Sequence, residues 1–297
     1  MNRNKIVAVA FAILAAALYA INIPFSKILI EHVDSTMMAG FLYLGAGVGM
    51  FLYTSISGVF GKRAVKEPLT KAELPYTIAM IILDIVAPIL LMHGLSITTS
   101  ANAALLNNFE IVATSLIALV VFKEFVSKKL WIAIGLVTLA SVILTFEGEG
   151  SFQFNIGSLM VLGAATCWGF ENNCTRMLSH KSSEEIVIIK GVFSGLGSII
   201  TAFILGEQIP DWIYIVLVLL LGFVSYGLSI NFYIMAQAKL GAAKTSAYYS
   251  IAPFLGAAFS LLLLGERPGL QFYVALAVLA VGTVVIVHDT LGDRSFS

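Results

Sequence analysis

Three acidic side chains stand within predominantly apolar segments of the sequence, and their chemistry is the first clue to function. They are Asp84, Glu110 and Glu171. An ionised group at the centre of a bilayer costs at least ~2.5–3.5 kcal/mol on insertion scales, so acids at this depth are candidates for function. We therefore expect these carboxylates to bind a cation or protons.

The balance of deep charges favours a positively charged solute. Lys190 is the one cation expected at comparable depth. Three carboxylates ionised together in a low dielectric would repel one another, so at least one is expected to hold a proton. The excess of acid predicts a cationic or amine-bearing solute, with protons and solute competing for Glu110 and Asp84. In the alternative, the solute is a neutral amino acid or metabolite, and the acids serve only as structural or proton-binding groups.

Glu110 belongs to a polar stripe along one helix face. Residues three and four apart share a face of a helix, and the stripe at this spacing consists of Ala103, Asn107, Glu110 and Thr114. Asn108 lies about a hundred degrees away and is expected to bond to a neighbouring helix. The stripe indicates a solute path, and its structural alternative is an interhelical pair that only holds packing.

The other two acids each have a structural alternative. Asp84 stands four residues before Pro88, where a protonated carboxyl could cap backbone groups that the proline frees. Glu171 could pair with Arg176 or Lys190 instead of contacting solute.

Amide and aromatic side chains complete the predicted site. Trp168 shares a helix face with Glu171, and Tyr19 and Asn22 occupy the matching face of the first apolar segment. Asn22 would equally fit an interhelical hydrogen bond. Tyrosine rings suit a pocket for an organic solute, although tyrosine is also common near membrane interfaces. The predicted substrate-binding residues are Tyr19, Asn22, Asp84, Asn107, Glu110, Trp168, Glu171, Tyr226, Tyr248 and Tyr249.

The elements that position these residues are membrane-spanning helices. Of the 297 residues, 59% are hydrophobic and 11% are charged, against roughly 25% charged in soluble domains. A helix needs roughly 17–25 apolar residues to cross a bilayer core. We predict an all-α integral membrane protein with ten transmembrane helices, at 6–26, 37–60, 74–93, 100–122, 130–146, 156–175, 185–206, 211–235, 243–264 and 270–288.

Two kinds of helix stand out among the ten. Pro88 and Pro253 lie inside helices, which they are expected to kink or locally break where a cavity or a neighbour satisfies the backbone. The segments 131–146 and 272–287 contain no charged residue. These two are expected to form outer scaffolding and to offer a face for a homodimer.

Basic residues orient the predicted helices. Fifteen of the 17 Lys and Arg residues fall on one side of the membrane, and only Lys27 and Arg267 fall on the other. The count places Lys190 on the first side, with Arg176 and Lys181. Positive charge accumulates on the cytoplasmic side. We therefore predict a multi-pass protein of the cell membrane with both termini cytoplasmic.

The second half of the chain repeats the first. At an offset of 149 residues, Gly45 aligns with Ser194, and both belong to small-residue motifs that allow close helix packing. We predict two five-helix units, 1–147 and 148–297. Five is an odd number, so the second unit enters the membrane from the opposite face. Inverted repeats of this kind recur in transporters, where one bundle rocks against another around a central site.

The sequence also resembles a known family. In the second half the matching residues are Gly-Ala-Ala-Lys at 241–244, Ala-Pro at 252–253 and Leu-Gly-Glu-Arg-Pro at 264–268, with a weaker counterpart at 100–103 and 122–124. This pattern resembles the EamA family of the drug/metabolite transporter superfamily and covers essentially the whole chain. The resemblance implies a ten-helix secondary carrier that moves small metabolites, amino acids or toxic compounds, mostly outward and without ATP.

The two halves differ at one signature position. Pro253 precedes Glu266 by thirteen residues, whereas the residue thirteen before Glu124 is Ile111, next to Glu110. The halves are therefore not expected to be functionally equivalent. Glu124 and Glu266 lie at helix ends, where we expect them to hold the turn into the next helix rather than to contact solute.

Other protein classes fit less well. The sequence contains no HExxH, GxSxG, Walker A or Cys/His cluster, so we expect no enzyme, catalytic residue, cofactor or metal. Equal numbers of acidic and basic residues give no attraction to nucleic acid. A membrane receptor or structural protein would not account for the repeat and the deep acids. The sequence therefore predicts a secondary active exporter of small organic solutes, coupled to proton exchange, with the lipid bilayer, protons and a homodimer as its partners.

Overall fold

The computed structural model describes residues 3–60, 67–122, 128–145, 155–240, 245 and 248–292. The predicted roles of Glu124 and of several basic residues, and the predicted boundary between the repeats at 147/148, lie outside these residues.

The described part of the chain is built from helices and contains no β-strand. In the first half the helices are α1 (Arg3–Ala20), α2 (Asn22–Leu29), α3 (Ser35–Phe60), η1 (Lys71–Glu73), α4 (Leu74–Ser96), α5 (Ser100–Leu106), α6 (Phe109–Phe122) and α7 (Lys128–Thr145). In the second half they are α8 (Ile156–Leu178), α9 (Ser183–Ile204), α10 (Trp212–Gly222), η2 (Phe223–Leu228), α11 (Ser229–Leu240), α13 (Ala252–Leu264) and α14 (Leu270–Gly292).

These helices account for the ten predicted spans. Six stretches of the described residues are long and apolar enough to cross a bilayer: Ile6–Leu29, Ser35–Ile56, Lys71–Ser96, Ser100–Val121, Ser183–Ile204 and Trp212–Leu240. Three shorter apolar helices are Trp131–Leu144, Ala252–Leu264 and Leu270–Val285. The tenth is α8, which has 23 residues and carries Glu171 and Arg176. The predicted all-α membrane fold is confirmed.

Prolines mark two interruptions of these spans. Pro24 lies in the first turn of α2 and lacks the N–H that would continue the hydrogen-bond ladder of α1, so the chain turns at Ile21. Pro253 lies in the first turn of α13, directly after a turn at residues 250–251, in agreement with the predicted break. Pro88, in contrast, does not interrupt α4, which continues through it to Ser96.

Two further irregularities carry no proline and were not predicted. The fourth span is divided into α5 and α6 by a turn at Asn107 and Asn108. The Asn108 Nδ2 donates to Thr283 Oγ1 on α14 at 3.3 Å, as expected of an interhelical amide. The eighth span contains η2, a π-helical segment, between α10 and α11. Wide turns of this kind often occur at functional sites.

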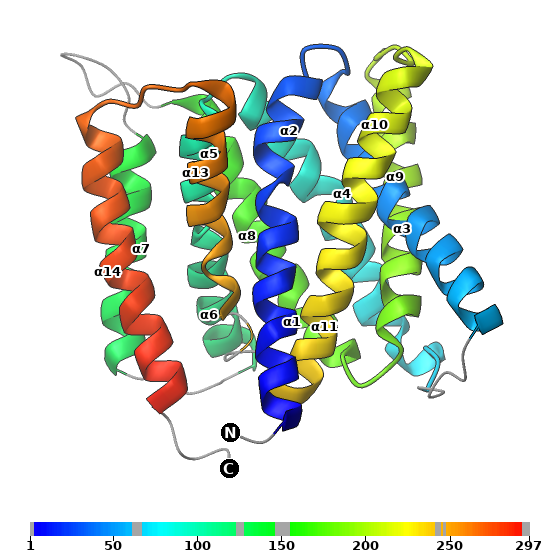
Figure 1. The fold of residues 1–297 in the computed structure, drawn as a ribbon, viewed down its shortest axis with the longest axis horizontal. Coiled ribbons are helices and arrows are strands. Elements are labelled where there is room, and N and C mark those ends of the chain that lie inside the picture. The colour runs from blue at the N-terminus through cyan, green and yellow to red at the C-terminus, as the bar shows by residue number, and fades with distance from the viewer. Residues whose placement is uncertain are drawn as a thin grey trace.

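The halves pack together through equivalent helices. Across the molecule, α3 packs against α9, α5 against α13 and α7 against α14 (Figure 1). These are the second, fourth and fifth helices of one repeat against their counterparts in the other. Two further interfaces between the halves, α4 with α8 and α1 with α11, are also equivalent to each other. Packing of each repeat against equivalent helices of the other is expected of two inverted five-helix repeats.

Glycines bring the central pair α3 and α9 into contact. A Cβ on Gly47 would lie 2.5 Å from the backbone nitrogen of Val192, and one on Gly191 would lie 2.3 Å from that of Gly47. Nearer the other end of the pair, Gly40 faces Gly195, so the helices run antiparallel. Neither position accepts a larger side chain without moving backbone.

Acids of the second half cap helices of the first. Glu266 accepts the N–H groups of Ser100 and Ala101, both at 2.8 Å, at the start of α5. Glu207 does the same for two N–H groups in the first turn of α3, at 3.1 and 2.7 Å. Glu266 thus has a structural role, and the helix that it caps belongs to the other repeat.

The helices α7 and α14 form one edge of the bundle (Figure 1). They expose large apolar side chains such as Trp131, Leu139 and Val281. This placement agrees with the predicted outer scaffold, and the homodimer face is still a prediction. The described ends of the chain, Arg3 and Gly292, lie at the same end of the bundle (Figure 1).

Candidate functional site

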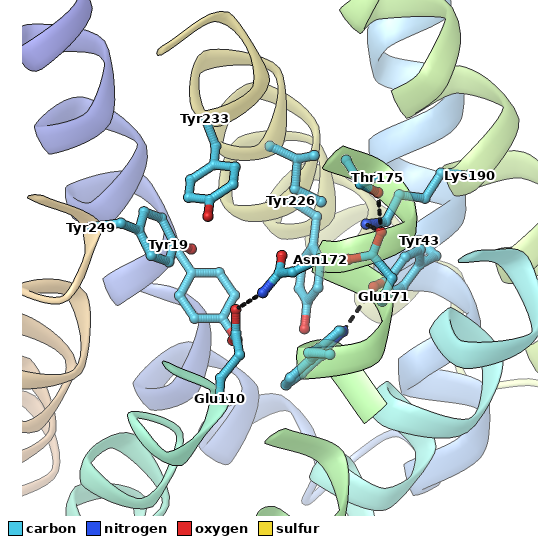
Figure 2. Close-up of a pocket in the computed structure, with 12 residues that line it drawn as sticks. Tyr19, Tyr43, Glu110, Glu171, Asn172, Thr175, Lys190, Tyr226, Tyr233 and Tyr249 are labelled. Atoms are coloured by element: carbon cyan, nitrogen blue, oxygen red, sulfur yellow. Dashed lines mark hydrogen bonds and ion pairs between the residues drawn. The ribbon is translucent and has the colours of Figure 1, made fainter. Parts of the chain in front are cut away.

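A cavity of about 520 Å³, partly open, lies between the two halves. Its polar lining consists of Glu110, Glu171, Asn172, Thr175 and Lys190. Its other lining residues are Tyr19, Tyr43, Trp168, Tyr226, Ile230, Tyr233 and Tyr249. Figure 2 shows most of these side chains converging from several helices. The arrangement combines a few charged groups with a wall of aromatic rings, as small-molecule sites do.

Glu110 forms the acidic wall of the cavity. It lies in the first turn of α6, where the N-terminus of a helix favours a negative charge. Asn172 on α8 donates to its Oε1 at 2.5 Å (Figure 2) and also reaches Thr114 at 3.4 Å. Within the described part of the chain, no Lys or Arg forms an ion pair with Glu110. The break at residues 107–108 starts a new helix here and so places this carboxylate beside the cavity.

A second charged cluster lies across the cavity around Lys190. The Lys190 Nζ is 3.1 Å from Asp84 Oδ2 and 2.9 Å from Glu171 Oε1. Asp84 is 0% exposed, Glu171 3% and Lys190 4%. Tyr43 donates to Asp84 Oδ1 at 2.7 Å, and Thr175 donates to Glu171. One ammonium group therefore holds two carboxylates away from water.

This cluster bears on three expectations and corrects two of them. Asp84 binds Tyr43 and Lys190, so it does not cap the backbone near Pro88. The partner of Glu171 is Lys190, one of the two cations proposed for it. Lys190 itself is buried within α9 and belongs to the site, so it should not be counted among the basic residues that orient the protein. The count of basic residues on each side of the membrane included Lys190, because it stands only seven residues after the start of its helix.

Five tyrosines form a continuous chain along the cavity. In order of contact they are Tyr43, Tyr226, Tyr19, Tyr249 and Tyr233, with ring centroids 5.0, 5.8, 5.9 and 5.0 Å apart. Aromatic pairs at such distances are favourable in edge-to-face and tilted arrangements. The chain begins at Tyr43, which donates to Asp84. It then passes Glu110, so it connects the two charged regions of the cavity (Figure 2).

Four predicted residues do not line this cavity. Asp84 lies behind it, and Tyr248 lies outside it. Asn22 is buried and donates to the Tyr226 hydroxyl at 3.3 Å, so it positions a lining ring. Asn107 donates to the Tyr19 hydroxyl at 2.8 Å and lines a smaller cavity of about 190 Å³ next to α13. The structure brings the other six, Tyr19, Glu110, Trp168, Glu171, Tyr226 and Tyr249, into the lining.

Several lining residues were not among the predicted set. Tyr43 had a signal in the sequence, since it stands well inside an apolar segment rather than at its interfacial end. Asn172 is adjacent to Glu171, but helical neighbours point about a hundred degrees apart, and only tertiary packing shows that both face the cavity. Thr175 follows Glu171 by four residues and so shares its helix face, which is a signal in the sequence, whereas the directions of Tyr233 and Lys190 depend on packing.

Comparison with known proteins agrees with this architecture. The EamA-like transporter family matches residues 6–146 and again residues 155–288. An uncharacterized transporter of Methanothermobacter thermautotrophicus is similar to the chain, at 24% identity over 296 residues that cover 92% of this chain and 84% of that protein. A protein of known crystal structure has the same fold, with a TM-score of 0.69, 17% identity and coverage of 98% of this chain and 99% of its own.

The family matches cover most of the chain in two consecutive copies, and both copies consist of apolar helices around a shared cavity. The family and the relative point to transport rather than catalysis. The chain belongs to the EamA-like transporter family of the drug/metabolite transporter superfamily and is a multi-pass membrane transporter of small solutes.

Proposed function

We propose that this transporter exports an amine-bearing or cationic organic solute in exchange for protons, and that the solute binds at Glu110. The observation that carries the proposal is the environment of this carboxylate: it lines the cavity, and Asn172, not a cation, is its hydrogen-bonding partner. A solute ammonium group would supply the charge that the described side chains leave unpaired.

The tyrosine chain supports the same solute class. Tyr19 and Tyr249 line the cavity together with Glu110. Aromatic faces attract cations, with about 0.5–2 kcal/mol per contact depending on desolvation. A carboxylate combined with several ring faces therefore favours a cation that carries apolar substituents over a strongly hydrated ion.

The position of the cavity supports export. Its lining includes Thr175, three residues before the end of α8, and Lys190, seven residues after the start of α9. Both helix ends lie at the end of the bundle that holds Arg3 and Gly292 (Figure 1). With the predicted orientation this is the cytoplasmic end, from which an exporter collects its solute.

The test is thermal stability of the purified protein with three probes: benzyltrimethylammonium, phenethylamine and leucine. A probe at 100 times its dissociation constant stabilises the folded state by about 2.7 kcal/mol. We expect the two amines to stabilise the wild type and to lose that effect in Glu110→Gln. The matched control is Glu31→Gln, the same change at an exposed acid, which should respond as the wild type does.

The opposite result would redirect the proposal. If leucine alone stabilises the protein and Glu110→Gln responds equally, the solute is a neutral amino acid or metabolite and the acid is not the selector. Proton exchange is tested separately in proteoliposomes that contain a trapped pH-sensitive dye, where amine and protons should move in opposite directions.

A further inference from the structure

The two charged regions of the site differ in their access to the cavity. Glu110 lines it directly. Asp84 is 0% exposed and is separated from it by its partners Tyr43 and Lys190, which do line it. A solute in the cavity therefore meets Glu110 but has no route to Asp84 in this conformation, whereas a proton can pass along hydrogen-bonded groups.

The Lys190 cluster holds an odd number of charges. When Asp84 and Glu171 are both ionised, the cluster carries one negative charge in excess. A buried excess charge is unfavourable, and groups in this situation tend to take up a proton instead. Adding one proton to a carboxylate brings the cluster to neutrality and leaves the ion pair between Lys190 and Glu171 intact.

We infer that Asp84, held by Lys190 and Tyr43, is the proton-binding site of this transporter and is separate from the solute-binding acid Glu110. The inference rests on the proposed function and replaces competition for shared acids by a division of roles. In the proton-bound state an O–H bond forms on Asp84, and its ion pair with Lys190 becomes a contact between an ammonium group and a neutral acid. The proton leaves when the carboxylate is regenerated.

Charged and titratable groups face Asp84 from every helix that packs closely around it. The groups that interact electrostatically with Asp84 are Tyr43 on α3, Cys167, Glu171 and Cys174 on α8, Lys190 on α9 and Tyr226 in η2. Lys190 and Glu171 are the two that are charged, so the charge of the cluster follows the state of Asp84.

This arrangement couples the binding of the proton to the binding of the solute through charge alone. Lys190 lines the cavity. When Asp84 is protonated, only Glu171 still balances the ammonium group, so the potential in the cavity becomes more positive. A cation at Glu110 is then bound more weakly. Proton and cation thus weaken each other's binding without sharing a residue, which favours exchange of one for the other.

The binding test uses benzyltrimethylammonium, because a quaternary amine does not titrate and any pH dependence belongs to the protein. In the wild type we expect its dissociation constant to rise as pH falls, by up to about tenfold per pH unit. Asp84→Asn gives the cluster, at every pH, the net charge that it has when Asp84 is protonated. This variant should bind with the weak, low-pH affinity of the wild type over the whole pH range in which Glu110 stays ionised. Full wild-type pH dependence in Asp84→Asn would overturn the inference while leaving solute binding at Glu110 intact.

A spectroscopic test does not depend on the solute. Infrared difference spectra recorded between high and low pH should show the carbonyl band of a buried protonated carboxyl group. The band should be absent in Asp84→Asn and present in Glu110→Gln. Tyr43→Phe serves as a second variant that keeps the carboxyl group: its band should move to higher frequency, because Tyr43 no longer donates to Asp84. A band that persists unchanged in Asp84→Asn would assign the proton elsewhere, even if no amine binds.

Discussion

At the scale of single residues, the site depends on one ammonium group. Lys190 contacts two carboxylates that come from different helices, α4 and α8. A buried ion pair is not by itself a strong source of stability, but removing one partner leaves the other buried and uncompensated. Lys190 thus allows Asp84 and Glu171 to exist inside the bundle, and Glu110 is the acid left available to a ligand.

The replacement Lys190→Met tests this dependence. It preserves an unbranched side chain of similar length and removes the charge. We expect the free energy of unfolding to fall by about 3–5 kcal/mol, because two buried carboxylates lose their counter-ion. The control Lys239→Met removes an exposed charge at the end of α11 and should have little effect. Adding Asp84→Asn and Glu171→Gln to Lys190→Met should restore much of the loss in thermal melts; an equal loss in the triple variant would contradict the charge argument.

At the scale of helices, close contacts on α3 set the frame around the site. This helix packs on α9 on one side and on α10 and η2 on another. A Cβ on Gly45 would lie 2.1 Å from the carbonyl oxygen of Leu219, which is backbone and cannot rotate away. Tyr43, on the same helix, contacts Asp84 on α4 and Tyr226 in η2.

The replacement Gly45→Ala should therefore be destabilising. Overpacking typically costs about 1–3 kcal/mol, and a contact with backbone places this site at the upper end of that range. Gly135→Ala in α7 is the matched control, since an added Cβ meets nothing within 4 Å; alanine there should be neutral or favourable by up to about 1 kcal/mol. Thermal unfolding in detergent compares the two. Equal stability of both variants would show that α3 can move away from α10 freely.

At the scale of the whole molecule, the internal repeat sets how the helices pack, and sequence differences between the repeats make the site asymmetric. Equivalent helices pair across the halves, yet the positions aligned with Glu171, Lys190 and Glu110 by the repeat offsets hold Asn22, Phe41 and Ala252. Each of these three charged residues therefore has an uncharged counterpart in the other repeat. This asymmetry agrees with the expectation that the halves are not functionally equivalent.

The predicted orientation is a property of the whole molecule and can be tested with single cysteines. In a background without Cys167 and Cys174, Gln208→Cys and His180→Cys place a thiol in exposed loops at opposite ends of the bundle. A membrane-impermeant maleimide should label position 208 in intact cells, and position 180 only after permeabilisation. The reverse pattern would place both termini outside and would turn the proposed export into uptake.

The sequence by itself determined the class of the protein. Apolar segments of bilayer length, the repeat and the family signature are one-dimensional features, because the membrane requires each span to satisfy its own backbone hydrogen bonds. They sufficed for the all-helical membrane fold, the two family-matching halves and the transporter family. They also identified Glu110 as a candidate acid at membrane depth, although the polar stripe predicted from Ala103 to Thr114 is divided in the structure by the turn at Asn107 and Asn108.

Only the tertiary structure decided which acids are paired and which line the cavity. Asp84 and Glu171 lie 106 and 19 residues from Lys190, and no local rule relates these positions. The break at Asn107 and Asn108, the π-helical segment around Tyr226 and the place of Tyr43 depend on neighbours packed from the other half. Contacts between distant segments set the direction of each side chain, so Glu110 was assigned to the solute, and Asp84 to the proton, on the basis of packing rather than spacing.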